Sequence, residues 1–244
     1  MRRALEHLSR MIYPGRLIAI GRDASGDFNV VIYALTGRSA SSQARKLVLE
    51  QGAVWTKPTD PEALAKGNPD LLLYPALVLG RGIAVSNGKQ TSDIDAGSPG
   101  SPVHALDHAL KNWTYEPDAP IYTPRISGCV LPSNRAALSV IKRADNGEAL
   151  RFFFELPLIA GKGKMISTYS GENKDQLPSF HGEPIDLELE ESSAAAMAEA
   201  VYAALGPQEA EKDLRVAVAC LFAKASDMTD HQFYLINRTE RMRT

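Results

Sequence analysis

The stretch YPGRLIAIGRDASGDFNVVIYALTGRSASSQAR, residues 13–45, decides how the rest of the chain is interpreted. Leu17, Ile18 and Ile20 form a short apolar run, and residues 30–33 (VVIY) form a second one. Between them, residues 23–26 (DASG) have the Asp, Ser and Gly chemistry of a tight turn. Two apolar, β-branched runs on either side of a turn predict a β-hairpin.

The second strand of this hairpin runs directly into a polar segment rich in glycine, serine and arginine. Gly37, Arg38 and Ser39 come first, and Gln43 and Arg45 follow after three small residues. Glycine permits close backbone approach, serine offers hydroxyls, and arginine offers a two-pronged donor for phosphate or carboxylate. We therefore expect this loop to bind an anion. The alternative is a polar hairpin exit whose arginines pair with surface carboxylates.

Composition limits the classes of protein to which this chain can belong. It has 244 residues, 44% of them hydrophobic, which is enough for one large domain, and we expect residues 1–244 to form one. The net charge of −2 and the lack of a long basic run argue against a nucleic-acid surface. Cys129 and Cys220 have no CxxC spacing and predict reduced thiols in a cytoplasmic protein.

Hydropathy predicts neither a signal peptide nor a membrane span. Glu6 and His7 interrupt any apolar core near the N-terminus. No run approaches the roughly eighteen apolar residues that cross a bilayer.

The remaining pattern contains many strands and few helices, which predicts an α+β fold with large antiparallel sheets. We expect helices over residues 3–11, from Pro61 for one turn, over 103–113 with Ser101 as N-cap, and over 192–205. The predicted later strands cover residues 46–51, 54–56, 71–79, 83–85, 126–130, 136–142, 150–156, 164–169, 187–189 and 233–237. Pro75, in the middle of one of them, predicts an edge strand or a bulge. Residues 217–223 are compatible with either helix or strand.

An ordered set of motifs gives the sequence a family resemblance. The motifs are YPGRLIAIG from Tyr13, TGRSASSQAR from Thr36, Tyr74 after Asn68-Pro69, Ser86-Asn87-Gly88 with Gln90-Thr91, Tyr115-Glu116, Thr123-Pro124-Arg125-Ile126 and the later Ile166-Ser-Thr-Tyr169. In this order the chain resembles the archaeal-type IMP cyclohydrolases and their bacterial relatives. The resemblance implies a four-layer αββα sandwich like that of the N-terminal-nucleophile hydrolases. It also implies ring closure of formamido-imidazole-carboxamide ribonucleotide to IMP, without metal or other cofactor.

The resemblance also assigns expected roles to particular residues. The partner would be a small-molecule purine nucleotide, and a homo-oligomer is possible. The expected catalytic residues are Tyr74, Glu116 and Arg38, and the expected substrate-binding residues are Arg16, Arg38, Arg45, Asn87, Gly88 and Arg125.

Each of these residues also has an ordinary structural explanation. Tyr74 would pack in a core strand with a satisfied hydroxyl, and Asn87 with Gly88 would form a plain hairpin turn. Glu116 would be a solvated loop carboxylate. Arg125 would pair with Glu116 or hold the substrate.

One departure from the family pattern leaves other functions open. Many relatives have Asn directly before the last arginine of the loop, whereas this chain has Gln43-Ala44. A purine-nucleotide-binding module without turnover and a related amidohydrolase are therefore alternatives. An N-terminal-nucleophile amidase needs a freed Cys, Ser or Thr, which Met1-Arg-Arg does not offer.

The sequence also contains one pair of candidate zinc ligands. His104 and His108 have the i, i+4 spacing of zinc ligands on a helix, but no third ligand stands at a suggestive position. We therefore expect no metal.

Overall fold

The computed structural model describes residues 5–207 and 212–242, which contain two antiparallel β-sheets. The six-stranded sheet has the order β11 (Ile185–Glu188), β10 (Lys162–Ser167), β1 (Arg16–Arg22), β2 (Phe28–Thr36), β12 (Arg215–Lys224) and β13 (His231–Asn237). The seven-stranded sheet has the order β3 (Arg45–Glu50), β4 (Ala53–Pro58), β5 (Pro75–Leu79), β6 (Ile83–Ser86), β7 (Arg125–Val130), β8 (Ala136–Arg143) and β9 (Ala149–Leu156). These strands confirm an α+β fold built on antiparallel sheets.

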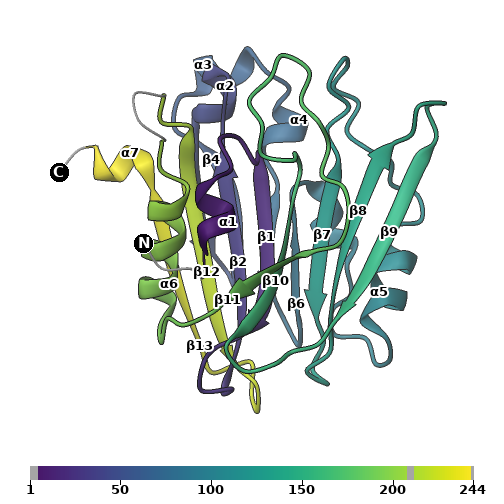
Figure 1. The fold of residues 1–244 in the computed structure, drawn as a ribbon, viewed down its shortest axis with the longest axis vertical. Helices are drawn as coiled ribbons and strands as arrows, with labels where there is room; N and C mark the ends of the chain where they lie inside the picture. The colour runs from purple at the N-terminus through teal and green to yellow at the C-terminus, as the bar shows by residue number, and fades with distance from the viewer. Residues whose placement is uncertain (1–4, 208–211, 243–244) are drawn as a thin grey trace.

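The helices are short and lie outside the sheets or at the ends of strands (Figure 1). Two of them, α5 (Pro102–Leu110) and α6 (Ala194–Ala204), are the longest in the described part of the chain. The others are α1 (Glu6–Ser9), α2 (Ala40–Gln43), α3 (Pro61–Ala65), α4 (Pro69–Leu72), the 3-10 helix η2 (Lys89–Asp93) and α7 (Arg238–Arg241). In Figure 1, α2, α3 and α4 lie together at the upper end of the sheets.

Three apolar clusters give the order of the layers. Residues of both sheets, among them Ile18 and Val85, share one cluster between the sheets. Successive strand residues point to opposite faces, so their neighbours pack outward. On the six-stranded sheet they meet Met197 of α6, and on the seven-stranded sheet they meet Leu106 of α5. This succession of helix, sheet, sheet and helix is compatible with the predicted four-layer sandwich. The likeness to N-terminal-nucleophile hydrolases stays a prediction.

The hairpin at the start of the chain is confirmed. In the register of β1 and β2, Ile18 lies opposite Tyr33. The turn is held by the Asp23 carboxylate, which accepts hydrogen bonds from the backbone N–H groups of Ser25 and Phe28 at 3.1 and 2.8 Å. The Asp side chain therefore replaces backbone partners at the tip, as its turn preference predicts.

The expectation of one strand over residues 71–79 is wrong in its first half. The helix α4 occupies Pro69–Leu72 because Pro69 opens it and Asn68 caps it, accepting from the backbone N–H of Asp70. The strand begins only at Pro75, so Tyr74 lies in the connection between them. A register shift opposite Pro75 confirms the bulge, whereas the edge position is wrong because β5 pairs on both sides.

Three other segments need comment. Residues 217–223 lie in β12, which pairs with β2 and β13. The first predicted helix is limited to α1 in the described chain, and residues 3–4 lie outside the described residues. The helix at Pro102 follows Ser101 as predicted, although the Ser101 side chain makes no capping hydrogen bond.

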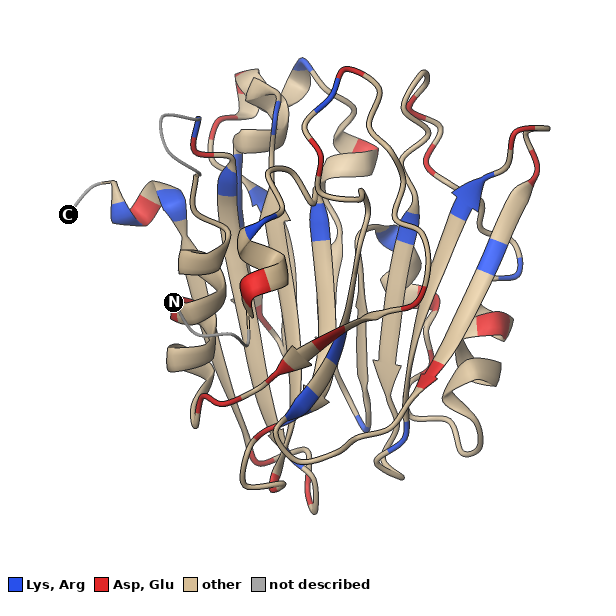
Figure 2. Cartoon of the chain, in the orientation of Figure 1, with Lys and Arg blue, Asp and Glu red and all other residues tan. Residues whose placement is uncertain are grey.

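Charge and hydropathy complete the description. Lys and Arg segments occur near the upper ends of several strands, the end at which α2, α3 and α4 lie (Figure 2). Among the described residues, no helix has both the length and the apolar character needed to cross a membrane.

Candidate active site

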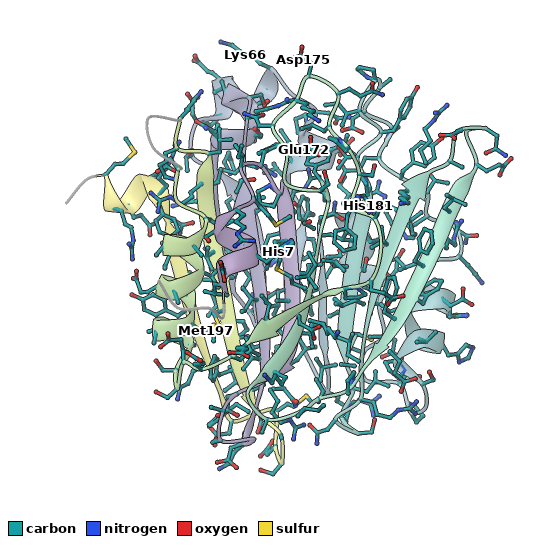
Figure 3. The ribbon with its side chains drawn as sticks, in the orientation of Figure 1. His7, Lys66, Glu172, Asp175, His181 and Met197 are labelled. Carbon is teal, nitrogen blue, oxygen red and sulfur yellow. The ribbon has the colours of Figure 1, made fainter. Side chains whose placement is uncertain are left out.

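A cavity of about 410 Å³ lies where the start of β1 meets four other segments of the chain. These segments are the loop containing α2, residues 67–72, the loop at 116–123 and the loop at 169–177. Figure 3 labels Lys66, which directly precedes residues 67–72, and Asp175 of the loop at 169–177 at the same end of the molecule. Of the predicted site residues, Arg16, Arg38 and Glu116 line the cavity.

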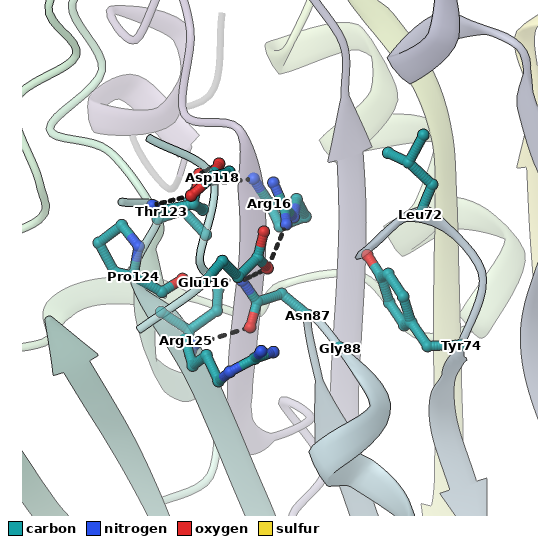
Figure 4. A network of polar contacts seen from close by, with 12 residues as sticks. Arg16, Leu72, Tyr74, Asn87, Gly88, Glu116, Asp118, Thr123, Pro124 and Arg125 are labelled. Atoms are coloured by element: carbon teal, nitrogen blue, oxygen red, sulfur yellow. Dashed lines mark hydrogen bonds and ion pairs between the residues drawn. The ribbon is translucent and has the colours of Figure 1, made fainter. Parts of the chain in front are cut away.

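A buried ion pair forms part of the cavity wall. Arg16 Nη2 donates to Glu116 Oε1 at 2.6 Å, and the two side chains are only 9% and 3% exposed (Figure 4). Gly15 positions Arg16 with a φ of +73°, a conformation that glycine adopts without steric cost. A Cβ at Gly15 would also lie 2.1 Å from Thr168 Oγ1, so no side chain fits there.

The two partners influence each other's ionisation. Burial raises the pKa of Glu116, while the Arg16 and Arg125 guanidiniums lower it, and the pKa remains above the ordinary value. Burial lowers the pKa of Arg16, but the Glu116 carboxylate and the nearby tyrosines together raise it by more, so Arg16 stays charged. A carboxyl group with a raised pKa beside a fixed cation is suited to accept and return a proton.

The side chain of Asn87 contacts both Glu116 and the backbone of the segment that follows it. Its side-chain amide donates to Pro124 O at 2.8 Å and reaches Glu116 Oε1 at 3.4 Å (Figure 4). Its side-chain oxygen accepts from the backbone N–H of Ile126 at 2.8 Å and from Gln90 at 3.0 Å. Asn87 is fully buried and does not line the cavity, so it holds the loop of Glu116 in place.

Gly88 and Arg125 belong to the same supporting layer. A Cβ at Gly88 would lie 2.4 Å from Gln90 Oε1 and 2.6 Å from Arg125 Nη1, so a side chain would displace these contacts. Arg125 donates to Thr114 O at 2.9 Å and to Gln90 Oε1 at 3.0 Å, and stacks on the Trp113 ring at 4.7 Å. Within the described residues, Glu116 has its ion pair with Arg16 and none with Arg125.

The two arginines of the loop after β2 lie in different environments. Arg38 lines the cavity beside Ser39 and Ser42, is partly exposed, and donates to Lys174 O at 2.6 Å. Arg45 is 1% exposed, and its Nε donates to Ser42 O at 3.0 Å. The Nη1 of Arg45 has no partner among the described residues, and Arg45 does not line the cavity.

Gln43 braces the loop after β2. Its side-chain amide donates to Gly37 O at 2.9 Å, and its side-chain oxygen accepts from Arg238 at 3.1 Å. Both ends of the side chain are therefore used within the protein.

Tyr74 is buried away from the cavity wall. It is 1% exposed, and its hydroxyl lies 2.7 Å from that of Tyr33. In Figure 4 it stands apart from the Arg16–Glu116 pair. Burial and the neighbouring Tyr74 raise the pKa of Tyr33. The two hydroxyls form a buried hydrogen-bonded pair, and neither tyrosine lines the cavity.

Asp118, Thr123 and Tyr169 form a second hydrogen-bonded network in the cavity, to which the sequence analysis assigned no role. Thr123 Oγ1 donates to Asp118 Oδ2 at 2.5 Å and lies 2.7 Å from the Tyr169 hydroxyl. Tyr169 also stacks on Tyr13, with ring centroids 5.5 Å apart. Burial raises the pKa of Tyr169 to about 12. Thr123 and Tyr169 stood in the quoted motifs, but Asp118 had no signal beyond its position two residues after Glu116.

The zinc alternative is not strengthened. His104 and His108 are exposed on α5, with ring centroids 6.5 Å apart. Over residues 5–207 and 212–242, no group of three His, Cys, Asp or Glu side chains is arranged to hold a metal ion.

A larger cavity, of about 930 Å³, lies at the opposite ends of the strands. It is lined by the loops around residues 80–81, 97–100, 132–135 and 225–229 and contains none of the predicted site residues. Size alone would select this cavity, whereas the buried ion pair and three of the predicted site residues lie at the smaller one.

Comparison with known proteins identifies the family of this chain. A search of curated proteins gave no significant match. A family profile described as IMP cyclohydrolase-like protein matches residues 13–227, which extends well past Tyr169, where the recognisable motifs end. The match covers the hairpin, every segment that lines the cavity, and all strands of the two sheets except β13. The chain belongs to the IMP cyclohydrolase-like protein family.

Proposed function

We propose that this protein is an IMP cyclohydrolase, which closes the ring of formamido-imidazole-carboxamide ribonucleotide to give IMP and water. The observation that carries the proposal is the buried Glu116 carboxyl, paired with Arg16 in the wall of the cavity. Membership of the IMP cyclohydrolase-like family supports this substrate class.

In the proposed reaction, the carboxamide nitrogen of the substrate attacks the formyl carbon. Glu116 accepts the proton that leaves this nitrogen, since an amide nitrogen is a poor nucleophile without a base. The formyl oxygen takes up the proton that Glu116 returns and becomes a hydroxyl group on the new ring. This hydroxyl then leaves as water with a second proton, which the former formamido N–H gives up as the C=N bond of the ring forms. The two protons on the departing oxygen thus come from the two nitrogens, and no electrons are transferred.

The raised pKa of Glu116 suits this double role. A raised pKa brings the carboxyl closer to the working pH, which helps it both to accept a proton and to give it back. The fixed positive charge of Arg16 keeps the carboxylate oriented and stabilises the ionised form. Holding the two reacting groups of the substrate in contact would supply much of the remaining acceleration.

The rim of the cavity suits the phosphate of the substrate. Arg38 is partly exposed and has serine hydroxyls beside it, at Ser39 and Ser42. A guanidinium and hydroxyls together satisfy several phosphate oxygens. Arg16 would then face the reacting end of the substrate. Asn87, Gly88 and Arg125 would act by fixing the loop of Glu116.

One observation favours a binding module as the second candidate. Tyr74, the expected donor to the formyl oxygen, is 1% exposed and bonded to Tyr33. A site that binds a purine nucleotide without turnover needs Arg38 and Arg16 but no such donor. A related amidohydrolase would use the same Glu116 on a different substrate.

The test is an ultraviolet assay of ring closure with purified protein, together with calorimetric titration of IMP. We expect turnover by the wild type, loss of turnover in Glu116→Gln, and normal turnover in Glu148→Gln, a matched change at an exposed loop glutamate. Tight IMP binding without turnover would establish the binding module instead. Neither binding nor turnover would point to another substrate.

We also propose a cytoplasmic location. Cys129 and Cys220 are both buried and unpaired, which is compatible with a reducing compartment. Cell fractionation would test this, and recovery in a secreted fraction would contradict it.

A further inference from the structure

The two edges of the β-sandwich differ in how their last strands are covered. At one side β13 packs beside β3, and the side chain of Asn237 bonds to the backbone of Leu47. The N–H of Leu47 donates to Asn237 Oδ1 at 2.8 Å, and Asn237 Nδ2 donates to Leu47 O at 2.9 Å. The side-chain amide thus takes the place of a neighbouring strand at Leu47.

The other side has no such cover over β9. This strand pairs with β8 only, and Figure 1 shows it as the right-hand border of the sheet. The opposite sheet ends on this side at β11, which has only four residues and two acidic side chains bound to lysines. Short, charged edges resist further pairing. By contrast, β9 has eight residues, and its Leu150 and Phe152 are 42% and 40% exposed.

The sequence of β9 is complementary to itself. Arg151, Phe153 and Glu155 point to one face of the strand, and Leu150, Phe152, Phe154 and Leu156 point to the other. Two antiparallel copies centred on Phe153 place each Arg151 opposite Glu155 of the second copy. Centring the pair on Arg151 or on Glu155 would instead oppose like charges, which is destabilising.

The charged groups at this edge have capacity for such contacts. Arg151 donates to the backbone oxygens of Trp113 and Lys111 at 2.5 and 3.3 Å, and no carboxylate in the described chain forms an ion pair with it. Both hydrogen bonds from Arg135 to Glu155 end on Oε1. Among the described residues no hydrogen bond ends on Oε2, so this atom is able to accept one from a guanidinium of another molecule.

We propose that β9 is the interface between two copies of this chain, paired antiparallel about a two-fold axis at Phe153. The seven-stranded sheets of the two copies then form one continuous sheet. On the inner face, Phe152 lies opposite Phe154 of the second copy, and Leu150 lies opposite Leu156, which covers the exposed apolar side chains. On the outer face the two Arg151–Glu155 pairs fix the register. This interface does not depend on the reaction at Glu116.

The first experiment measures the mass of the full-length protein by light scattering after gel filtration. We expect wild type at twice the chain mass of 26.5 kDa, and Leu150→Lys/Phe152→Lys at the mass of one chain. The control is Leu49→Lys, a side chain 43% exposed on β3, which should remain a dimer. A monomeric wild type, or a lysine double variant that stays dimeric, overturns the proposal.

The second experiment tests the register. Arg151→Glu and Glu155→Arg should each give monomers, because each places like charges opposite one another, and the combined variant should restore the dimer. In parallel, Phe153→Cys should form an intermolecular disulfide under mild oxidation, since the two Cα atoms lie about 5 Å apart across an antiparallel pair. Arg151→Cys should not, because its copies lie farther apart than about 7 Å, the limit for a disulfide.

Folding of every variant is checked by circular dichroism, and Phe153→Cys keeps the test valid if a charge variant does not fold. The native cysteines are buried, so the introduced thiol is the reactive one. A cross-link at position 151 but not at 153 contradicts the register, and no cross-link at either position contradicts the interface.

Discussion

Arg16 and Arg45 are both buried arginines that stand at the first position of a β-strand, yet only one of them belongs to the cavity. Arg16 opens β1, faces the cavity and has the carboxylate of Glu116 at 2.6 Å. Arg45 opens β3, is 1% exposed, and one of its terminal nitrogens has no partner in the described chain. The family resemblance predicted both arginines to be substrate-binding residues.

The difference comes from contacts that are distant in sequence. Glu116 is 100 residues from Arg16, and it reaches the cavity because Asn87 and the backbone around Pro124 hold its loop. Around Arg45, the nearest bonded oxygen is that of Ser42 in the same loop. Arg16 and Arg45 therefore differ because the fold places a carboxylate beside Arg16 and only a backbone oxygen beside Arg45.

The largest expected effect is on the stability of Arg16→Met. This change leaves the Glu116 carboxylate buried without its partner, which costs about 3–5 kcal/mol of unfolding free energy. Without Arg16, the pKa of Glu116 in the folded state rises further above its unfolded value. The unfolded state then ionises first as the pH rises, so the loss should be greater at pH 8 than at pH 5. Urea unfolding at both pH values measures it, and an equal loss at both would contradict the ion-pair explanation.

The next effect is on turnover in Glu116→Gln. Removal of a general base lowers the rate by roughly a hundredfold or more, while product binding needs no base and should persist. The ultraviolet assay and an IMP titration separate the two quantities. Equal losses of turnover and IMP affinity would show that Glu116 serves binding.

Tyr74→Phe provides the comparison for Glu116→Gln. If the Tyr74 hydroxyl stabilises the formyl oxygen in the transition state, kcat falls and IMP affinity is retained. The buried bond to Tyr33 predicts instead that the change mainly removes a structural contact. Unchanged kcat with a lower melting temperature would remove Tyr74 from the catalytic residues.

The third effect distinguishes Arg38 from Arg45 in nucleotide binding. Arg38→Met should weaken IMP binding by about 1.5–3 kcal/mol, the value of a charge-assisted hydrogen bond. Arg45→Met should leave IMP affinity nearly unchanged, because Arg45 does not line the cavity. Calorimetric titration of both variants measures this. A large loss of IMP affinity in Arg45→Met would mean that the loop rearranges on binding. Arg38 and Arg45 would then not differ in function.

A smaller effect concerns the pH dependence of turnover. In the proposed reaction the active form of Glu116 is the ionised one, so kcat should fall as the pH drops through its pKa. Because burial keeps this pKa raised, the fall should occur above 4.5, the ordinary value for a glutamate. The residual turnover of Glu116→Gln should not show this fall. A fall in wild-type kcat centred at or below pH 4.5 would contradict the assignment of Glu116 as the base.

The smallest expected effect is that of a chelator. Turnover should survive prolonged treatment with EDTA, since the sequence offers no third ligand beside His104 and His108. Loss of turnover that zinc restores would require a different mechanism, one in which a metal rather than Glu116 activates the reacting group.

The local sequence was sufficient for most of the strands and for the turn at Asp23. Their signals are alternation, β-branched residues and turn chemistry, which act over a few neighbouring residues. It was insufficient at residues 69–79, where an apolar run concealed a helix and a strand. The capping bond of Asn68 and the bulge opposite Pro75 separate these elements, and the bulge involves the distant strand β4.

For the site, the sequence alone determined which residue types were available: arginines in a glycine- and serine-rich loop, Glu116 in a proline-rich loop, and the ordered motifs. Only the tertiary structure decided that Glu116 meets Arg16, that Arg45 and Tyr74 lie behind the cavity wall, and that Asp118, Thr123 and Tyr169 join it. The reason is physical: burial and charge pairing depend on which distant segments pack together. A side chain's solvent exposure and pKa follow from that packing, and a motif does not contain them.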